Sequence, residues 1–237
     1  MLIEKYASIK ELSCLLIFLH IPKTGGVSIH QLLEEVYGGE YFRHSQTKKK
    51  YWQDLSPSEL SRLKCLSGHL KFGVHKKMNR DAVYLTVVRD PVERVVSLFH
   101  QKEKRMLREG RAFPHGYRVD DWVLEQIGRN DRRFYTQCEI VCGSNSFEKA
   151  KTVLNRSYLA FCDIAQASNM ARVLQCALGV PHYKELERLN VRPSWIEKQM
   201  PSEETDSRLR DYFSEDFALV SYCASRFGDV FEKFKLD

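Results

Sequence analysis

Two short segments of the chain bring basic, hydroxyl and glycine residues together directly after apolar runs. The first, "PKTGG" (Pro22–Gly26), follows the apolar run Cys14–Leu19 and precedes a helix-like pattern. Glycines let an anion approach the backbone, and the free N–H groups at a helix N-terminus favour it. Lys23 adds a positive charge, and Thr24 and Ser28 add hydroxyl donors. We therefore expect a phosphate-binding loop at Lys23, Thr24, Gly25, Gly26 and Ser28, with a glycine turn that binds nothing as the alternative.

The first loop is not a Walker A motif. That motif is G-x-x-x-x-G-K-[ST], in which the lysine follows the glycines and the next hydroxyl holds Mg²⁺. Here Lys23 precedes Gly25 and Gly26, and no other segment supplies the motif. A P-loop nucleotide or metabolite kinase remains a rival interpretation, but the sequence does not favour it.

A second segment repeats the arrangement of strand, basic turn and helix. In "YLTVVRDPVERVVSLFH", Arg89 ends an apolar run, and Ser97 follows eight residues later within a predicted helix. Asp90 is the expected N-cap of that helix, and Arg94 and Ser97 are expected to share a face. An arginine fork beside a hydroxyl suits a second phosphate. The alternative is that Arg89 only pairs with Asp90 or Glu93.

Strands alternate with helices along the chain, which predicts an α/β fold with a central, mainly parallel sheet flanked by helices. Ligands of such folds bind beyond the carboxyl ends of the strands, where both segments would lie. We expect a single domain over residues 1–237, with an insertion or acceptor-binding segment at about 102–160. The predicted strands are Cys14–Leu19, Lys64–His69, Ala82–Val88 and Tyr158–Ile164. The predicted helices are Val27–Val36, Val92–Arg108, Val119–Ile127, Phe147–Leu154, Ala167–Leu178, Glu203–Tyr212 and Glu215–Phe227.

Composition limits the class of protein. With 43% hydrophobic and 29% charged residues, the chain is an ordinary globular protein, and its net charge of +6 mildly favours anionic partners. Seven scattered cysteines without a C-x-x-C pair predict reduced thiols rather than a disulfide framework or a zinc site, although Cys138 and Cys142 could bridge. The apolar stretch Leu12–Ile21 is too short to span a membrane, so we expect a cytoplasmic protein with no membrane span.

Together, "FLHIPKTGGVS" and "VVRDPVERVVSLF" strongly resemble the PAPS-dependent sulfotransferases, above all the carbohydrate branch that includes the heparan 2-O-sulfotransferases and their bacterial relatives. The resemblance implies a P-loop-like three-layer fold. It implies that the first loop, with the amides of Gly25, Gly26 and Val27, binds the 5′-phosphosulfate of 3′-phosphoadenosine 5′-phosphosulfate (PAPS). It also implies that Arg89 and Ser97 bind the 3′-phosphate. The segment Glu187–Trp195 resembles the family's late loop near the nucleotide, which makes Asn190 and Arg192 further candidate contacts.

The implied reaction moves a sulfuryl group from PAPS to an acceptor hydroxyl, and the resemblance favours a carbohydrate. Lys23 would stabilise the charge that develops on the bridging oxygen. His69 matches the catalytic histidine of the carbohydrate branch and is the candidate general base. His75 is its nearest rival, His20 could support the first loop, and an acidic base of the kind used in other branches is also open. No metal is required.

The acceptor is less well defined by the sequence. Three basic runs, Lys48–Trp52, Lys76–Arg80 and Lys102–Arg111, could hold an anionic glycan or could form ordinary solvated faces. A non-catalytic polyanion-binding protein is the rival from another class, but no nucleic-acid-binding module is recognisable. The sequence makes no prediction of the oligomeric state.

Overall fold

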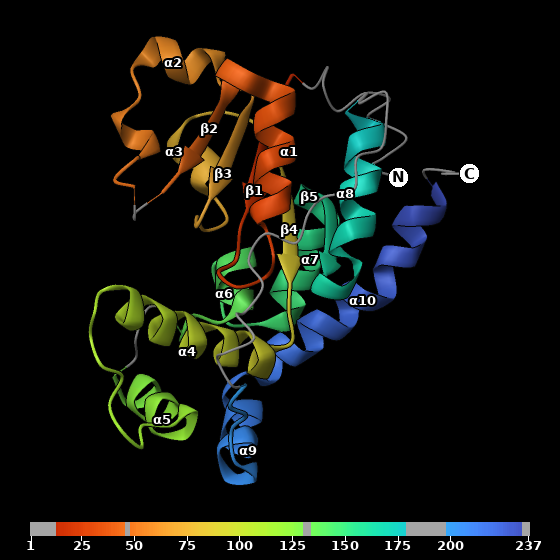
Figure 1. Ribbon diagram of the computed structural model, residues 1–237. Helices are drawn as coiled ribbons and strands as arrows, with labels where there is room; N and C mark the ends of the chain where they lie inside the picture. Colours follow the sequence, from red (N-terminus) through yellow and green to blue (C-terminus); the bar gives the residue numbers. More distant parts are fainter. Residues whose placement is uncertain (1–12, 46–47, 130–133, 179–197, 234–237) are drawn as a thin grey trace.

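The computed structural model describes residues 13–45, 48–129, 134–178 and 198–233 (Figure 1). Its centre is a five-stranded sheet in the order β2-β3-β1-β4-β5, and every neighbouring pair of strands is parallel. The predicted parallel α/β sheet is therefore confirmed. The strands are β1 (Leu15–Leu19), β2 (Tyr41–His44), β3 (Cys65–Gly68), β4 (Ala82–Val88) and β5 (Tyr158–Asp163).

Strand β1 forms the middle of the sheet because its sequence is apolar at every position. All five residues of Leu15–Leu19 are buried, with β3 on one side and β4 on the other. Leu15, Ile17 and Leu19 enter one apolar cluster, while Leu16 and Phe18 enter another on the opposite face. A strand covered on both faces needs this continuous apolar run rather than an alternating pattern.

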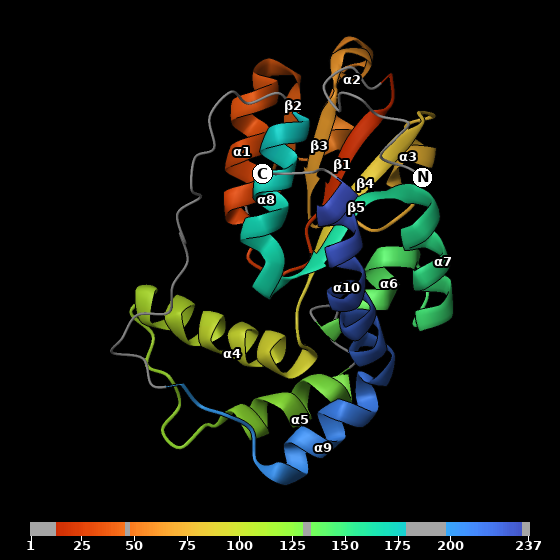
Figure 2. The same ribbon diagram turned by 90° about the vertical axis from the view of Figure 1, so that its right-hand side faces the viewer.

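Helices cover both faces of the sheet and give the expected three layers (Figure 2). One face carries α1 (Val27–Tyr37) and α8 (Ala167–Ala177). The other face carries four helices. They are α3 (Val74–Lys77), α6 (Gln137–Cys142), α7 (Phe147–Ser157) and α10 (Ser214–Lys233). The short α2 (Pro57–Arg62) connects β2 with β3.

A third apolar cluster lies beyond the carboxyl ends of the strands, where α4 (Pro91–Arg108) crosses beneath the sheet (Figure 1). Helices α5 (Val119–Arg129) and α9 (Glu203–Tyr212) pack against α4 there, around the buried rings of Phe99 and Trp122. The segment 102–160 is therefore divided between two parts of the fold. Its first part belongs to this cluster, and its last part, with α6, α7 and the start of β5, belongs to the main layers.

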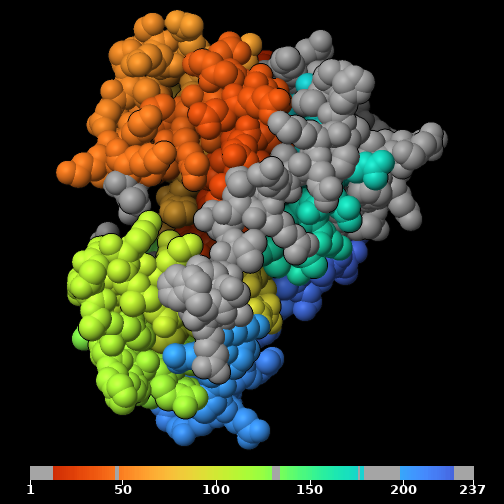
Figure 3. All heavy atoms as spheres, viewed as in Figure 1, coloured from red at the N-terminus to blue at the C-terminus, as the bar shows by residue number. Residues whose placement is uncertain are grey.

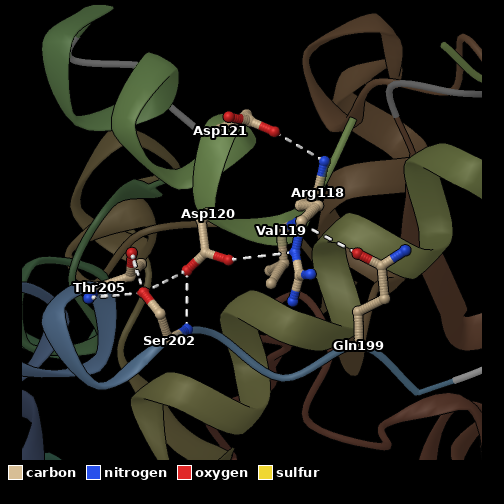
Figure 4. A network of polar contacts seen from close by, with 7 residues as sticks. All are labelled: Arg118, Val119, Asp120, Asp121, Gln199, Ser202 and Thr205. Atoms are coloured by element: carbon tan, nitrogen blue, oxygen red, sulfur yellow. Dashed lines mark hydrogen bonds and ion pairs between the residues drawn. The ribbon is translucent and has the colours of Figure 1, made fainter. Parts of the chain in front are cut away.

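Polar contacts join the start of α5 to the chain before α9 (Figure 4). The carboxylate of Asp120 accepts hydrogen bonds from the backbone N–H of Ser202, at 2.7 Å, and from its hydroxyl, at 2.8 Å. The side-chain oxygen of Gln199 accepts a hydrogen bond from the backbone N–H of Val119 at 3.3 Å. These contacts hold residues 199–202 against α5, next to Lys198, which reaches α4.

Among the described residues, six cysteines are free thiols, and Cys65, Cys138, Cys162 and Cys223 are buried. No helix in this part of the chain is both long and apolar enough to cross a membrane.

Candidate active site at the carboxyl edge of the sheet

A cavity of about 520 Å³ opens at the carboxyl ends of the strands, and each strand supplies part of its wall. In Figure 3 the surface is hollowed between the orange N-terminal region and the yellow-green helices below it. The contributing residues are Arg43 in β2, His69 after β3, His20 after β1, Arg89 after β4 and Ile164 after β5. The predicted site therefore lies where the parallel sheet requires it.

The first loop turns sharply between β1 and α1, and it leaves the N-terminus of the helix uncapped by side chains. Lys23 and Gly25 both have positive φ angles, of 73° and 78°. Gly26 is the N-cap of α1, with no side-chain hydrogen bond to the first turn. A Cβ atom on Gly26 would lie 2.5 Å from Cδ2 of His20, so only glycine fits there. The geometry suits an anion at the backbone amides of Gly26 and Val27, both of which line the cavity.

The two hydroxyl groups predicted to serve this loop are not in the cavity wall. Thr24 is fully buried, and its hydroxyl donates to the carbonyl oxygen of Ile21 at 2.8 Å, so it stabilises the turn. Ser28 is the second residue of α1 and makes interactions within the protein. The direct contact of these two hydroxyls with a ligand stays a prediction.

Arg89 joins the two loops. Its Nη1 donates to the carbonyl oxygen of Lys23 at 3.1 Å, and its Nη2 lies 3.2 Å from a carboxylate oxygen of Glu93. The other carboxylate oxygen of Glu93 accepts a hydrogen bond from Lys198 at 2.8 Å. Arg89 therefore lines the cavity and also makes the ion pair with Glu93 that the alternative interpretation of this segment gave it. Burial, with the nearby positive charges of Arg89 and Lys104, lowers the pKa of Lys23.

The backbone of Arg89 is held from the other side by Gln137, a fully buried residue at the start of α6. The Gln137 side-chain oxygen accepts a hydrogen bond from the Arg89 N–H at 3.0 Å, and its amide nitrogen donates to the Arg89 carbonyl at 2.7 Å. Gln137 in turn donates its backbone N–H to the carboxylate of Asp216, which is fully buried. Two further elements, α6 and α10, thus fix the end of β4.

Helix α4 presents a polar stripe to the cavity. Asp90 caps this helix by accepting a hydrogen bond from the N–H of Glu93 at 2.9 Å, as predicted. Arg94 does not share the face of Ser97. It is buried, donates to the carbonyl oxygen of Tyr135 at 2.9 Å and lies over the ring of Phe213. The expected common face is therefore wrong, because Arg94 serves the apolar cluster of α4, α5 and α9. The stripe consists of Glu93, Ser97, His100, Gln101, Lys104 and Arg108.

His69 lies at the end of β3 with its side chain exposed to the cavity. The cavity walls exclude part of its water and, with the charge of Arg43, lower its pKa below 6.5. An imidazole that stays neutral at pH 7 can accept a proton. His75, the rival base, instead contacts the hydroxyl of Tyr84 at 2.6 Å and does not line the cavity.

The remaining predicted residues and the basic runs are distributed differently. Asn190 and Arg192 lie outside the described residues. Lys104 and Arg108 bring the basic run of α4 into the cavity, whereas the side chain of Arg80 binds the carbonyl oxygens of Leu60 and Leu63. In the described ranges, no group of three or more His, Cys, Asp or Glu side chains is arranged to hold a metal ion.

Known proteins resemble this chain in sequence pattern and in fold. The chain matches a model of the sulfotransferase family over residues 11–222. It is similar to a crystal structure of a sulfotransferase from Alicyclobacillus acidocaldarius, with a TM-score of 0.50 and 12% sequence identity, over 89% of this chain and 96% of that one. At this identity the likeness concerns the fold. No curated protein matches the chain. From the family match over most of its length, the chain belongs to the sulfotransferase family.

Proposed function

We propose that this sulfotransferase takes its sulfuryl group from PAPS and transfers it to an acceptor hydroxyl, with a carbohydrate as the expected acceptor. One observation carries the proposal. The helix N-terminus of the first loop and the guanidinium of Arg89 are joined by the hydrogen bond to Lys23, and they face one cavity together with Ser97. A nucleotide with anionic groups at both its 5′ and 3′ positions matches this pair of anion sites.

The residues of the first loop would act on the leaving group. During transfer the bond between sulfur and the bridging oxygen breaks, and its electron pair moves to the 5′-phosphate, while the acceptor oxygen forms a bond to sulfur. The amides of Gly26 and Val27 and the ammonium of Lys23 would stabilise the charge that develops. His69 would accept the proton of the acceptor hydroxyl.

The charge of the cavity favours an anionic acceptor. Its wall carries six lysine and arginine side chains and one carboxylate, that of Glu93, which already pairs with Arg89 and Lys198. Arg43, Lys104 and Arg108 remain beyond the residues assigned to the nucleotide. We therefore expect a carbohydrate that carries carboxylate or sulfate groups to be preferred over a neutral one.

The experiment that tests this function follows the formation of 3′,5′-ADP and of sulfated product from PAPS with a panel of acceptors. The panel pairs uronic-acid-containing polysaccharides with neutral ones, and Mg·ATP replaces PAPS as the control for a kinase. We expect acceptor-dependent turnover of PAPS, and a loss of about 10²–10³-fold in the Lys23→Ala variant. Phosphoryl transfer from Mg·ATP, or polyanion binding without any turnover of PAPS, would contradict the proposal.

A further inference from the structure

A series of hydrogen-bonded side chains, buried except for the half-buried Tyr41, runs from β2 to the cavity. The hydroxyl of Tyr41 lies 2.6 Å from that of Ser67, which lies 2.9 Å from Nδ1 of His30. Nε2 of His30 lies 2.9 Å from Nδ1 of His20, the histidine that lines the cavity beside the first loop. These hydrogen bonds thus link β2, β3 and the residue after β1 to α1.

These side chains lie where charge is costly. His30 and Ser67 are almost completely buried, and His20 is only 8% exposed. Burial, together with the charges of Arg43 and His69, lowers the pKa of His30 to about 3. Burial and the neighbouring His30 lower the pKa of His20 well below 6.5. Both imidazoles are therefore neutral at pH 7, and each carries one N–H.

Counting the hydroxyl hydrogens of Tyr41 and Ser67 gives this series of hydrogen bonds a direction. If Nδ1 of His30 accepts from Ser67, the hydroxyl of Tyr41 can donate to Ser67, and each hydroxyl hydrogen has an acceptor. In the reverse direction Ser67 would donate to Tyr41, and the Tyr41 hydroxyl would donate to Nδ1 of His30, which lies 3.1 Å away. Nδ1 of His30 accepts in both arrangements, because a proton on Nδ1 would leave one of the two hydroxyl hydrogens without an acceptor among the described residues. A phenol is also more acidic than an aliphatic hydroxyl, which makes Tyr41 the better donor of the short contact. His30 then donates through Nε2 to Nδ1 of His20, so the proton of His20 is on Nε2.

Nε2 of His20 ends this chain beside the candidate anion site. It makes no hydrogen bond within the described residues, and it would lie 2.7 Å from a Cβ atom on Gly26, the N-cap of α1. The first turn of α1 contains no acidic residue, and no side chain caps it. A nitrogen without a partner, on a side chain that is only 8% exposed and lines the cavity, and an uncapped helix N-terminus therefore converge on one place.

We propose that His20 is a neutral hydrogen-bond donor to the phosphosulfate group, and that Tyr41, Ser67 and His30 are positioning residues that fix its Nε2–H tautomer. The assignment rests on the proposed function. His20 keeps its proton throughout, because it stabilises the electron pair that moves to the leaving phosphate. The proton of the acceptor goes to His69, whose ring centroid lies 5.0 Å from that of His20. Each of the two neighbouring histidines thus has a separate role.

The tautomers can be measured without any ligand. In ¹⁵N-histidine-labelled protein, long-range ¹H–¹⁵N spectra distinguish Nε2–H, Nδ1–H and imidazolium, and the His20→Gln and His30→Gln variants assign the signals. At pH 7 we expect both His20 and His30 as Nε2–H. Nδ1–H tautomers or a charged His20 would overturn the assignment even if PAPS proved to be the donor.

A matched pair of substitutions tests the donor role. Glutamine can retain an N–H near the position of Nε2, whereas methionine has a similar length and no donor. We expect kcat to fall about 10²-fold in His20→Met but to stay within about tenfold of the wild type in His20→Gln, with an unchanged pH profile. Equal losses in both variants would identify His20 as a base or as a packing residue and overturn the proposal. Thermal unfolding checks that each variant folds.

The positioning residues require their own readout. In the Tyr41→Phe/Ser67→Ala double variant, Nδ1 of His30 loses its donors, so we expect the ¹⁵N signals of His20 to move towards a mixture of tautomers and kcat to fall by about tenfold or more. An unchanged His20 tautomer would refute the positioning role of Tyr41 and Ser67. If the wild type binds no 3′,5′-ADP and does not turn over PAPS, the proposed function itself fails and the donor assignment fails with it.

Discussion

His69 is a general-base candidate whose ionisation is set by its surroundings. It stands at the end of β3 and faces the cavity, whose walls exclude part of its water and, with the charge of Arg43, lower its pKa below 6.5. Because a base acts in its neutral form, a lowered pKa keeps His69 active as the pH falls through 6.5.

This ionisation predicts the acid side of the pH profile. The kcat/KM of the wild type should remain level from pH 7.5 to about 6.5 and fall only at lower pH. His69→Ala should lower kcat by about 10²–10⁴-fold and remove that acid limb, since the titrating base is gone. The matched control is His75→Ala, because His75 contacts Tyr84 outside the cavity. An acid limb that persists in His69→Ala would assign the base to another group.

At the scale of elements, strong local signals allowed accurate prediction. The buried run of β1, the β-branched β4 and the Asp90-Pro91 start of α4 lie within one or two residues of their predicted bounds. The two loops follow from these elements, because parallel strands end at one edge of the sheet. The sequence allowed Gly26 to be predicted as a position where another group comes close to the backbone. It did not allow the contact between Gly26 and His20 to be predicted.

What the sequence did not reveal depends on tertiary contacts or on weak local patterns. The strand β2 has only four residues, with Arg43 and His44 at its end, so its contribution to the cavity was missed. Helix α6 was also missed, although its capping box of Thr136 and Glu139 is a readable signal. The polar stripe of α4 could have been found by continuing from Ser97 at helical spacing. Lys198 lies far from Glu93 in the sequence, so only the folded structure reveals their contact.

The contact between α6 and β4 predicts an effect of Gln137 on nucleotide binding. Gln137→Leu removes both hydrogen bonds to the backbone of Arg89, so we expect the affinity for 3′,5′-ADP to fall by about tenfold and that for 5′-AMP to change little. Calorimetric titration measures both. Asn155→Leu is the matched control, because it removes only a side-chain contact with Tyr222 that does not line the cavity. An equal loss for the two ligands would show a general structural effect instead.

For the whole molecule, the buried histidines link folding to pH. His30 has a pKa of about 3 when folded, against 6.5 for an ordinary histidine. Above pH 6.5 it is neutral in both states. As the pH falls from 6.5 towards 3, the unfolded chain binds a proton that the folded one does not, so the free energy of unfolding decreases. His20 acts in the same direction.

This linkage predicts a loss of stability in mild acid. From pH 6.5 to 5.5, each such histidine should lower the free energy of unfolding by up to about 1.4 kcal/mol. Urea unfolding at pH 7.5, 6.5 and 5.5 measures the slope. The His30→Gln variant, which cannot titrate, should show a shallower slope than the wild type. Identical slopes in the two proteins would mean that His30 does not carry the linkage.

The most direct test of the two-anion site compares the binding of 3′,5′-ADP and 5′-AMP to the wild type and to Arg89→Ala. At a concentration about 100 times its dissociation constant, a ligand should stabilise the fold by about 2.7 kcal/mol, which thermal unfolding detects. We predict a clear shift with 3′,5′-ADP that is largely lost with 5′-AMP and in Arg89→Ala. Equal shifts with both nucleotides, or a shift with Mg·ATP alone, would contradict the assignment of Arg89 to a 3′-phosphate and with it the proposed use of PAPS.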